Sequence, residues 1–266
     1  MIFALRGAVS RFFANDGFFL SAGLAFFVMV TFIPIVLLAV STLGFVLTSE
    51  QAASEVVGHL ARNFPVYTRE IRSAMMRIVE TRAVSGVVGT VILVAFSTPL
   101  FSASRLVLHR LLGLRLPQSF LRNFMVDSGL AILIGALLFA ATIATWMFNW
   151  FEAFVLEPAG VSSRWLNITN LGFSVAVSAV TLYLAYRYMP RHRVRGSAAL
   201  AGAVLGSLLW EVAKQLFSLY IRKVGIYDQI YGPLGVLIAF VMFVYYSAIV
   251  FVFGGAYVAA IETRRR

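Results

Sequence analysis

The stretch GSAALAGAVLGSLLWEVAKQLFSLYI (Gly196–Ile221) has 26 residues, and Glu211 and Lys214 are the only charged ones. A helix needs about 20 mostly apolar residues to cross the ~30 Å hydrocarbon core of a bilayer. The stretch therefore predicts a membrane-spanning helix. Its two charges stand out, because placing one charge at the centre of such a helix costs about 2.5–3.5 kcal/mol or more.

The composition of the whole chain agrees with a membrane environment. Of its 266 residues, 61% are hydrophobic and only 12% are charged, and the mean hydropathy is +0.89. A soluble domain has about 25% charged residues. We therefore expect a polytopic membrane protein. The chain has no cysteine, which excludes disulfides, thiolate metal sites and cysteine nucleophiles.

Charge-poor runs divide the chain into six segments. Open sheets cannot span lipid, and a barrel would show short alternating strands, so we expect helices. The prediction is an all-α, polytopic bundle of six transmembrane helices that forms one membrane domain over residues 1–266. Its spans are expected at about residues 17–47, 83–104, 128–151, 165–186, 196–221 and 231–261. Pro34 should kink the first span, because proline removes a backbone donor.

Basic residues predict the orientation of the bundle. Short loops that stay in the cytoplasm carry an excess of Lys and Arg. Thirteen basic residues flank the spans on the side of the two termini, and eight lie on the opposite side. We therefore expect both termini to lie in the cytoplasm. No small-residue cleavage site precedes the first span, so we expect that span to remain in the mature protein.

Two segments look amphipathic rather than spanning. Residues 2–13 place apolar side chains around two arginines, as an interfacial helix does; these apolar side chains are Ile2, Leu5, Val9, Phe12 and Phe13. Residues 67–83 alternate charged and apolar side chains at helical spacing. We expect a short extracytoplasmic helix there, lying on the bundle or the headgroups, with a partner-binding helix as the alternative.

The sequence offers little support for catalysis or for binding nucleic acid. His59, His109 and His192 are expected in different loops, and none has a second ligand at metal-binding spacing. We therefore expect no enzyme activity, no metal and no cofactor. The net charge of +11 fits basic loops that contact anionic headgroups, so membrane lipids are the expected partners and nucleic acid is not.

The charged pair belongs to a polar stripe on the fifth expected span. Glu211 and Lys214 lie about 60° apart on a helix and can pair directly. The stripe consists of Ser207, Glu211, Lys214, Gln215, Ser218 and Arg222. A possible facing stripe on the fourth span consists of Asn167, Asn170, Ser174, Ser178 and Thr181. A different face of the fifth span carries Ala198, Gly202 and Gly206, a small-residue series suited to close helix packing.

Two interpretations of these stripes stay open. In the first, the stripes line a hydrated cavity that admits a polar, charged or lipid-type substrate, since ionisable residues within the membrane usually mark function. In the second, they are contacts between helices, and Glu211 and Lys214 only neutralise one another. The pattern does not name a substrate in either case.

Two segments carry a family resemblance. SAGLAFFVMVTFIPIVLLAVSTLG (Ser21–Gly44) resembles the first-span signature of the YihY/virulence factor BrkB family, and Arg187–Phe240 resembles its most distinctive block. The matching positions in that block are Pro190, Gly202, Trp210, Lys214, Phe217, Tyr220, Tyr231, Gly232 and Gly235. The resemblance implies a six-helix inner-membrane protein of a family once mislabelled ribonuclease BN. Some members are linked with serum resistance and virulence, and transport of envelope lipids or other solutes has been proposed.

The chain departs from the family pattern in two places. The aromatic pair in the first span is usually tyrosine, and here it is Phe26 and Phe27. The usual Gly-Ala-Glu of the last span is Gly-Ala-Tyr here, with Tyr257 in place of the glutamate. A role of that glutamate would have to be lost or moved to Glu262.

Together these observations give a transporter or flippase-like protein with a polar cavity along the fifth span as the leading hypothesis. The alternative is a membrane scaffold that binds lipids or partners and supports envelope integrity or virulence without transport. We do not expect ribonuclease activity.

Overall fold

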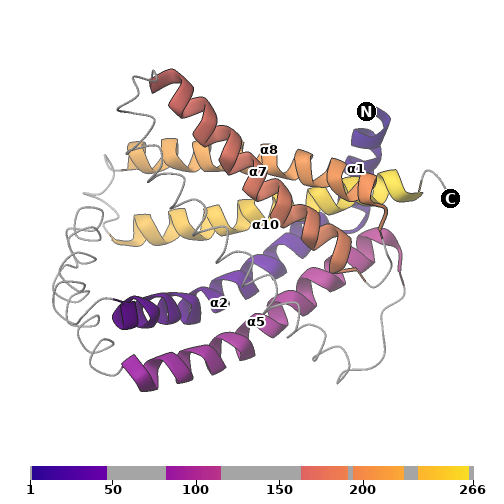
Figure 1. Cartoon of the computed structure of the whole chain (residues 1–266). Coiled ribbons are helices and arrows are strands. Elements are labelled where there is room, and N and C mark those ends of the chain that lie inside the picture. Colours follow the sequence, from indigo (N-terminus) through magenta and orange to yellow (C-terminus); the bar gives the residue numbers. More distant parts are fainter. Residues whose placement is uncertain (1, 47–81, 115–162, 191–193, 225–232, 264–266) are drawn as a thin grey trace. The chain divides into compact units, whose positions relative to one another are not determined.

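The computed structural model describes residues 2–46, 82–114, 163–190, 194–224 and 233–263. Every regular element in these ranges is an α-helix, as the sequence predicts (Figure 1). The helices are α1 (Ile2–Ala14), α2 (Gly17–Val46), α5 (Arg82–Leu112), α7 (Ser163–Tyr188), α8 (Gly196–Val224) and α10 (Pro233–Thr263).

Two of these helices are long and apolar enough to cross a bilayer by themselves. They contain the segments Gly196–Leu219 in α8 and Ile238–Thr263 in α10. The bent pair formed by α1 and the start of α2 would count as a third span if it is taken as one. These findings confirm an all-α membrane protein, while the six-span topology and the cytoplasmic termini stay predictions.

The predicted spans can be compared with the helices one by one. Five of the six coincide with helices, namely α2, α5, α7, α8 and α10. The third, residues 128–151, lies outside the described residues, as does nearly all of the expected helix at residues 67–83. Helix α2 continues through Pro34, and the kink expected there stays a prediction.

The chain divides into two compact units. One consists of Met1–Phe26 with Phe101–Arg266, and the other of Phe27–Leu100. In the second unit, the Thr31 hydroxyl donates to the Phe27 carbonyl one turn earlier, at 2.7 Å, which satisfies a polar group inside an apolar helix. The single membrane domain expected over residues 1–266 stays a prediction.

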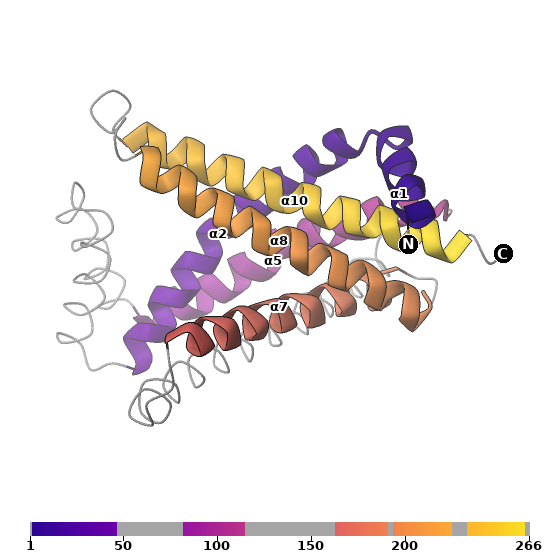
Figure 2. The ribbon, with the colours of Figure 1, turned by 90° about the horizontal axis from the view of Figure 1, so that it is seen from above.

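Helix α8 occupies the middle of the first unit. It packs against α7 on one side and against α10 on the other, and α1 packs against α10. Figures 1 and 2 show α8 and α10 running antiparallel along most of their length, with α1 across the end of α10 that leads to the C-terminus. Any side chain of α8 can therefore face α7, α10 or the outside.

Tyr186 lies at the centre of the closest packing in this unit and is fully buried. Its hydroxyl donates to the Phe251 carbonyl of α10 at 2.9 Å. A Cβ on Gly254 would strike that hydroxyl, and a Cβ on Gly202 would strike Val258. The surrounding core residues are Leu108, Ala185, Met189, Val194, Ala198, Ala199, Ala203 and Val258. Small residues thus let the backbones of α8 and α10 approach one another around one large ring.

The structure corrects the expected end of the second span. Helix α5 continues from residue 104 to Leu112, because Val107, Leu108 and Leu111 are buried and continue the apolar face past the charges. Gly113, at φ 67°, ends the helix in the left-handed conformation that glycine adopts without strain.

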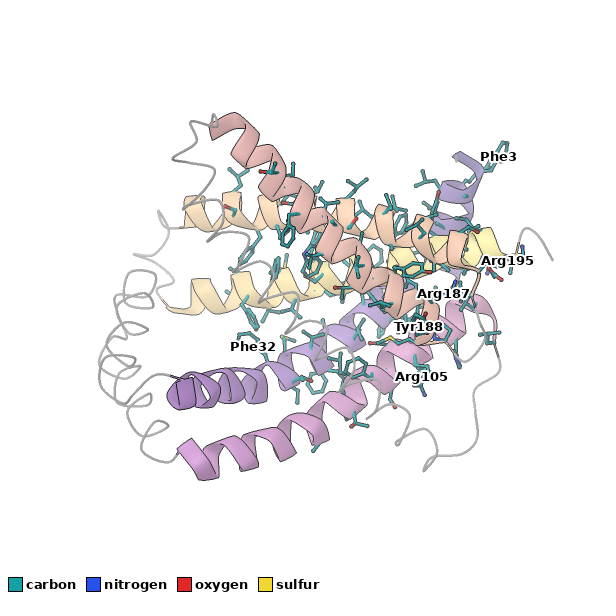
Figure 3. All side chains as sticks on the ribbon, in the orientation of Figure 1. Phe3, Phe32, Arg105, Arg187, Tyr188 and Arg195 are labelled. Carbon is teal, nitrogen blue, oxygen red and sulfur yellow. The ribbon has the colours of Figure 1, made fainter. Side chains whose placement is uncertain are left out.

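This longer helix changes the placement of two charged or titratable residues. The prediction that His109 lies in a loop was wrong, because it is buried within α5. Arg105 is buried as well, and its Nε donates to the Met189 carbonyl at the end of α7 at 3.2 Å (Figure 3). One of the basic residues that follow the second predicted span, Arg105, is therefore buried among the helices.

Candidate functional site

The charged pair of α8 forms a direct contact. The Lys214 ammonium lies 2.5 Å from Glu211 Oε2, and the two side chains are 32% and 17% exposed. Their spacing of three residues puts them on one face of the helix. A carboxylate and an ammonium in this position neutralise one another, which lowers the cost of placing both within an apolar helix.

A serine from the neighbouring helix joins the pair. The Ser174 hydroxyl of α7 donates to Glu211 Oε2 at 3.3 Å and accepts from the Lys214 ammonium at 2.6 Å. We call Ser174, Glu211 and Lys214 the α8 polar cluster. Two hydrogen bonds of Ser174 thus link α7 to the ion pair of α8.

The other members of the predicted α8 stripe are spread over different environments. Ser207 is buried, and its hydroxyl donates to the Val204 carbonyl of its own helix at 3.0 Å. Gln215 and Ser218 are exposed. The side chain of Arg222 lies outside the described residues. The stripe is therefore not one continuous lining of the bundle interior over the described residues.

Only one residue of the predicted α7 stripe reaches the cluster among those whose side chains are described. That residue is Ser174. Thr181 is half-buried and donates to the Val177 carbonyl of its own helix at 2.9 Å, and Ser178 is half-buried. The side chains of Asn167 and Asn170 lie outside the described residues. Because α7 and α8 pack antiparallel, a residue of α7 reaches Glu211 and Lys214 where it lies at the same height along the helix axes, and Ser174 lies at that height.

The small-residue series lies on the packed side of α8. Ala198 is buried in the Tyr186 core. A Cβ on Gly202 would also come within 3.1 Å of the Gly254 carbonyl of α10. A Cβ on Gly206 would come within 2.8 Å of Leu182 of α7. A side chain at Gly202 would press on the backbone of α10, whereas one at Gly206 would meet the flexible end of Leu182.

An apolar groove of about 370 Å³ opens between α8 and α10. We call it the α8–α10 groove, and its lining consists of Ala213, Leu216, Phe217, Ile238, Ala239, Met242, Phe243 and Tyr246. The rings of Phe217 and Phe243 lie 4.6 Å apart and form its aromatic wall. No residue of the α8 polar cluster lines it. This groove could not be predicted from the sequence, because apolar residues occur on every face of a spanning helix.

A second carboxylate contact lies at the start of α8. Glu262, near the end of α10, is buried and accepts from the Arg195 backbone N–H at 3.3 Å, while its other oxygen lies 3.9 Å from Arg195 Nε. Arg195 directly precedes α8. A carboxylate at this point caps the helix and interacts favourably with the positive end of its dipole.

The described residues contain no group of three His, Asp or Glu side chains that could hold a metal ion. The α8 polar cluster offers charge and hydrogen bonds to a ligand. A Lys ammonium has three N–H donors, and a carboxylate has about four lone-pair positions. Two donors of Lys214 serve Glu211 and Ser174, which leaves capacity for a polar ligand.

The comparison with known families decides the identity. The profile of the family described as Virulence factor BrkB matches residues 8–266. The chain belongs to the virulence factor BrkB family. The resemblance seen in Ser21–Gly44 and Arg187–Phe240 is thereby confirmed, and the matched region includes both the α8 polar cluster and the α8–α10 groove.

Relatives of this BrkB-family chain are described as UPF0761 membrane proteins. One from Chlorobium chlorochromatii is 29% identical over 250 residues, which cover 92% of this chain and 56% of the relative. One from Pseudoalteromonas atlantica is 26% identical over 262 residues, or 95% of this chain and 85% of the relative. The chain spans little more than half the length of the Chlorobium relative. No solved structure matches the chain.

The two departures from the BrkB pattern occupy different environments. Tyr257 is buried in α10, so the position of the usual family glutamate is an aromatic packing position here. Phe26 is exposed in α2. Glu262 is the carboxylate nearest to Tyr257 along α10, and its contact with Arg195 is the capping contact described above.

Proposed function

We propose that this BrkB-family protein moves a lipid-type envelope substrate across the bacterial inner membrane. One observation carries the proposal. Within residues 211–217, α8 holds a charged polar cluster against α7 and, on another face, one wall of an apolar groove against α10. A single helix thus presents polar and apolar binding surfaces at one depth.

A lipid has chemistry that matches both surfaces. Its headgroup carries phosphate oxygens that a lysine ammonium can bind, and its acyl chains are stabilised by contact with apolar walls. The α8 polar cluster would bind the headgroup during passage, and the α8–α10 groove would hold a chain. Because Glu211 and Lys214 neutralise one another at rest, a headgroup would have to compete with Glu211 for Lys214.

The same contact favours a second candidate. The α8 polar cluster closes on itself through three contacts, which is what a purely structural link between α7 and α8 needs. In that case the protein is a membrane scaffold that binds lipids or partners without moving a substrate. The two candidates differ in whether lipid moves along the α8–α10 groove.

Blocking the groove separates these candidates. Leu216→Trp fills the groove, whereas Leu219→Trp adds the same ring at a site outside the groove lining; the two leucines are 51% and 52% exposed. The assay uses proteoliposomes with NBD-labelled phosphatidylethanolamine, and dithionite bleaches the label in the outer leaflet. We expect Leu216→Trp to slow lipid exchange at least fivefold and Leu219→Trp to leave it unchanged. Equal rates in both variants and in empty vesicles would favour the scaffold.

The orientation of the protein is part of the proposal. Reporter fusions after Arg115 and after Arg193 are expected to report cytoplasm, and fusions near Arg69 and Glu157 the opposite side, because basic short loops resist translocation. An outside signal at Arg193 would contradict six spans with cytoplasmic termini.

A further inference from the structure

Helix α1 uses one face to pack against the bundle. Ala8 and Phe12 are buried, and the Phe12 ring lies 5.9 Å from the ring of Phe253 in α10. A Cβ on Gly7 would come within 3.2 Å of the Ala260 Cβ. These contacts fix which side of α1 faces the protein.

Arg11 ties α1 to the ends of two other helices. Its Nη1 donates to the Leu111 carbonyl at the end of α5 at 3.1 Å, and its Nη2 donates to the Thr263 hydroxyl, the last residue of α10, at 2.6 Å. The C-terminus of a helix carries partial negative charge, so a guanidinium is stabilised there. The sequence predicts an interfacial helix over residues 2–13 but does not say which of its side chains face the protein.

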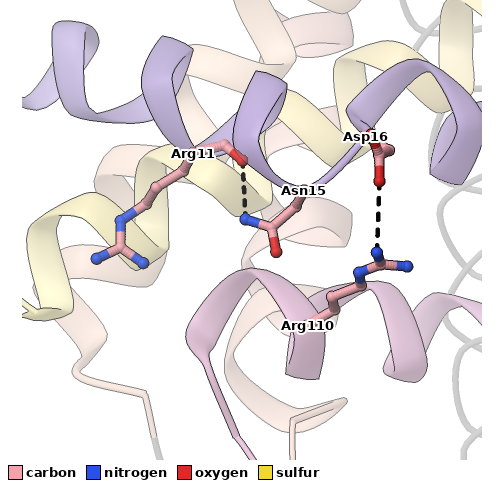
Figure 4. A network of polar contacts seen from close by, with 4 residues as sticks. All are labelled: Arg11, Asn15, Asp16 and Arg110. Atoms are coloured by element: carbon pink, nitrogen blue, oxygen red, sulfur yellow. Dashed lines mark hydrogen bonds and ion pairs between the residues drawn. The ribbon is translucent and has the colours of Figure 1, made fainter.

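The turn between α1 and α2 holds the two helices at 73° to one another. Asp16 adopts φ 54°, and Asn15 Nδ2 donates to the Arg11 carbonyl at 2.9 Å. Nη2 of Arg110, a residue of α5, lies 3.5 Å from Oδ2 of Asp16 in this turn (Figure 4). If α2 crosses the bilayer near its normal, α1 lies closer to the membrane plane than to the normal.

The outward side of α1 and the start of α2 is aromatic, with one exposed arginine on α1. Phe3, Phe13 and Phe19 are 73%, 62% and 84% exposed, and Figure 3 shows Phe3 pointing away from the bundle. Arg6 is exposed as well and lies between Phe3 and Phe13 around the helix. Residues 1–15 contain no acidic side chain. A contiguous apolar face of this kind marks an interaction surface.

We infer that this surface, made of Phe3, Arg6, Val9 and Phe13, binds the membrane interface, with Arg6 on the phosphate of an anionic lipid. The surface runs on through Phe18 and Phe19, which are exposed at the start of α2. Aromatic rings and arginine together suit the boundary between headgroups and acyl chains. The exposed part of α1 carries Arg6 and no acid, and Asp16 in the turn is paired with Arg110, so the surface favours anionic lipids over a basic protein partner. The inference does not depend on lipid transport.

The test uses the full chain in nanodiscs and its natural lack of cysteine. Single cysteines at Val9 and Phe13, both exposed, carry a nitroxide whose collisions with oxygen and with a water-soluble nickel chelate report depth. We expect both labels to lie about 5–10 Å below the headgroups, and to move deeper as phosphatidylglycerol is added to phosphatidylcholine.

The charge is tested by a matched pair of variants. Arg6→Gln is expected to raise the phosphatidylglycerol fraction needed for half of that shift about fivefold. Arg195→Gln removes an equal charge from an exposed arginine outside this surface and should leave the shift unchanged. Labels that collide freely with nickel in all lipids would overturn the inference, because the face would be in water. Labels shielded from both reagents, with close label-to-label distances between copies, would overturn it in favour of a dimer contact.

Discussion

Replacing Gly254 with alanine should destabilise the protein through a collision with Tyr186. The new Cβ would strike the Tyr186 hydroxyl and come within 3.0 Å of its Cζ. The ring cannot easily move away, because it is fully buried and its hydroxyl is bonded to the Phe251 carbonyl at 2.9 Å. Overpacking costs about 1–3 kcal/mol, and a buried hydroxyl that loses its partner costs about 1–3 kcal/mol more. We expect a total of about 3 kcal/mol.

The measurement is reversible unfolding in mixed micelles titrated with denaturing detergent. The matched control is Gly172→Ala in α7, where a Cβ would meet nothing within 4 Å, so the change should be neutral or stabilising by up to about 1 kcal/mol. Adding Tyr186→Phe to Gly254→Ala removes the atom that collides. The double variant should recover at least about 1 kcal/mol relative to additivity. Equal stabilities of the two alanine variants, or no coupling with Tyr186, would refute the argument.

Three further predictions concern polar contacts, each measured as the free energy of unfolding by the same titration. Lys214→Ala should cost about 1–3 kcal/mol, because it leaves a mostly buried carboxylate without its counter-ion. Glu211→Gln should cost about 1 kcal/mol, because the lysine that remains can extend to water. A larger cost for Glu211→Gln than for Lys214→Ala would contradict this reasoning. Ser174→Ala removes two hydrogen bonds and should cost about 1 kcal/mol, and no change would mean that the α7 contact is dispensable. Glu262→Gln weakens the cap on α8 at Arg195 and should cost about 0.5–1 kcal/mol, less at high salt; a cost that does not vary with salt would argue against the dipole.

The class of fold and most helix positions could be predicted from the sequence, because apolar length is a direct physical requirement of the bilayer. The limits of the helices were less predictable. The second span was expected to end at residue 104, where charges begin, but α5 runs to Leu112. A charge marks the end of a charge-free run and does not end a helix whose apolar face continues.

The candidate site was only partly accessible to sequence reasoning. The pairing of Glu211 with Lys214 follows from a spacing within one helix, which the period of the helix determines. The contact with Ser174 depends on which level of α7 meets α8, and that is decided by packing. The burial of Tyr186 and the α8–α10 groove could not be predicted from the sequence. Both depend on how the side chains of different helices pack together.

The central claim is that Glu211 and Lys214 serve a substrate as well as the fold. The double variant Glu211→Gln/Lys214→Met removes both charges and keeps side chains of similar size, so no carboxylate is left without a counter-ion. Its unfolding free energy and its exchange of NBD-labelled phosphatidylethanolamine are measured on the same preparation. We predict stability within about 1 kcal/mol of the natural chain together with loss of lipid exchange. Stability and exchange that both match the natural chain would contradict the claim and leave the pair as a structural contact.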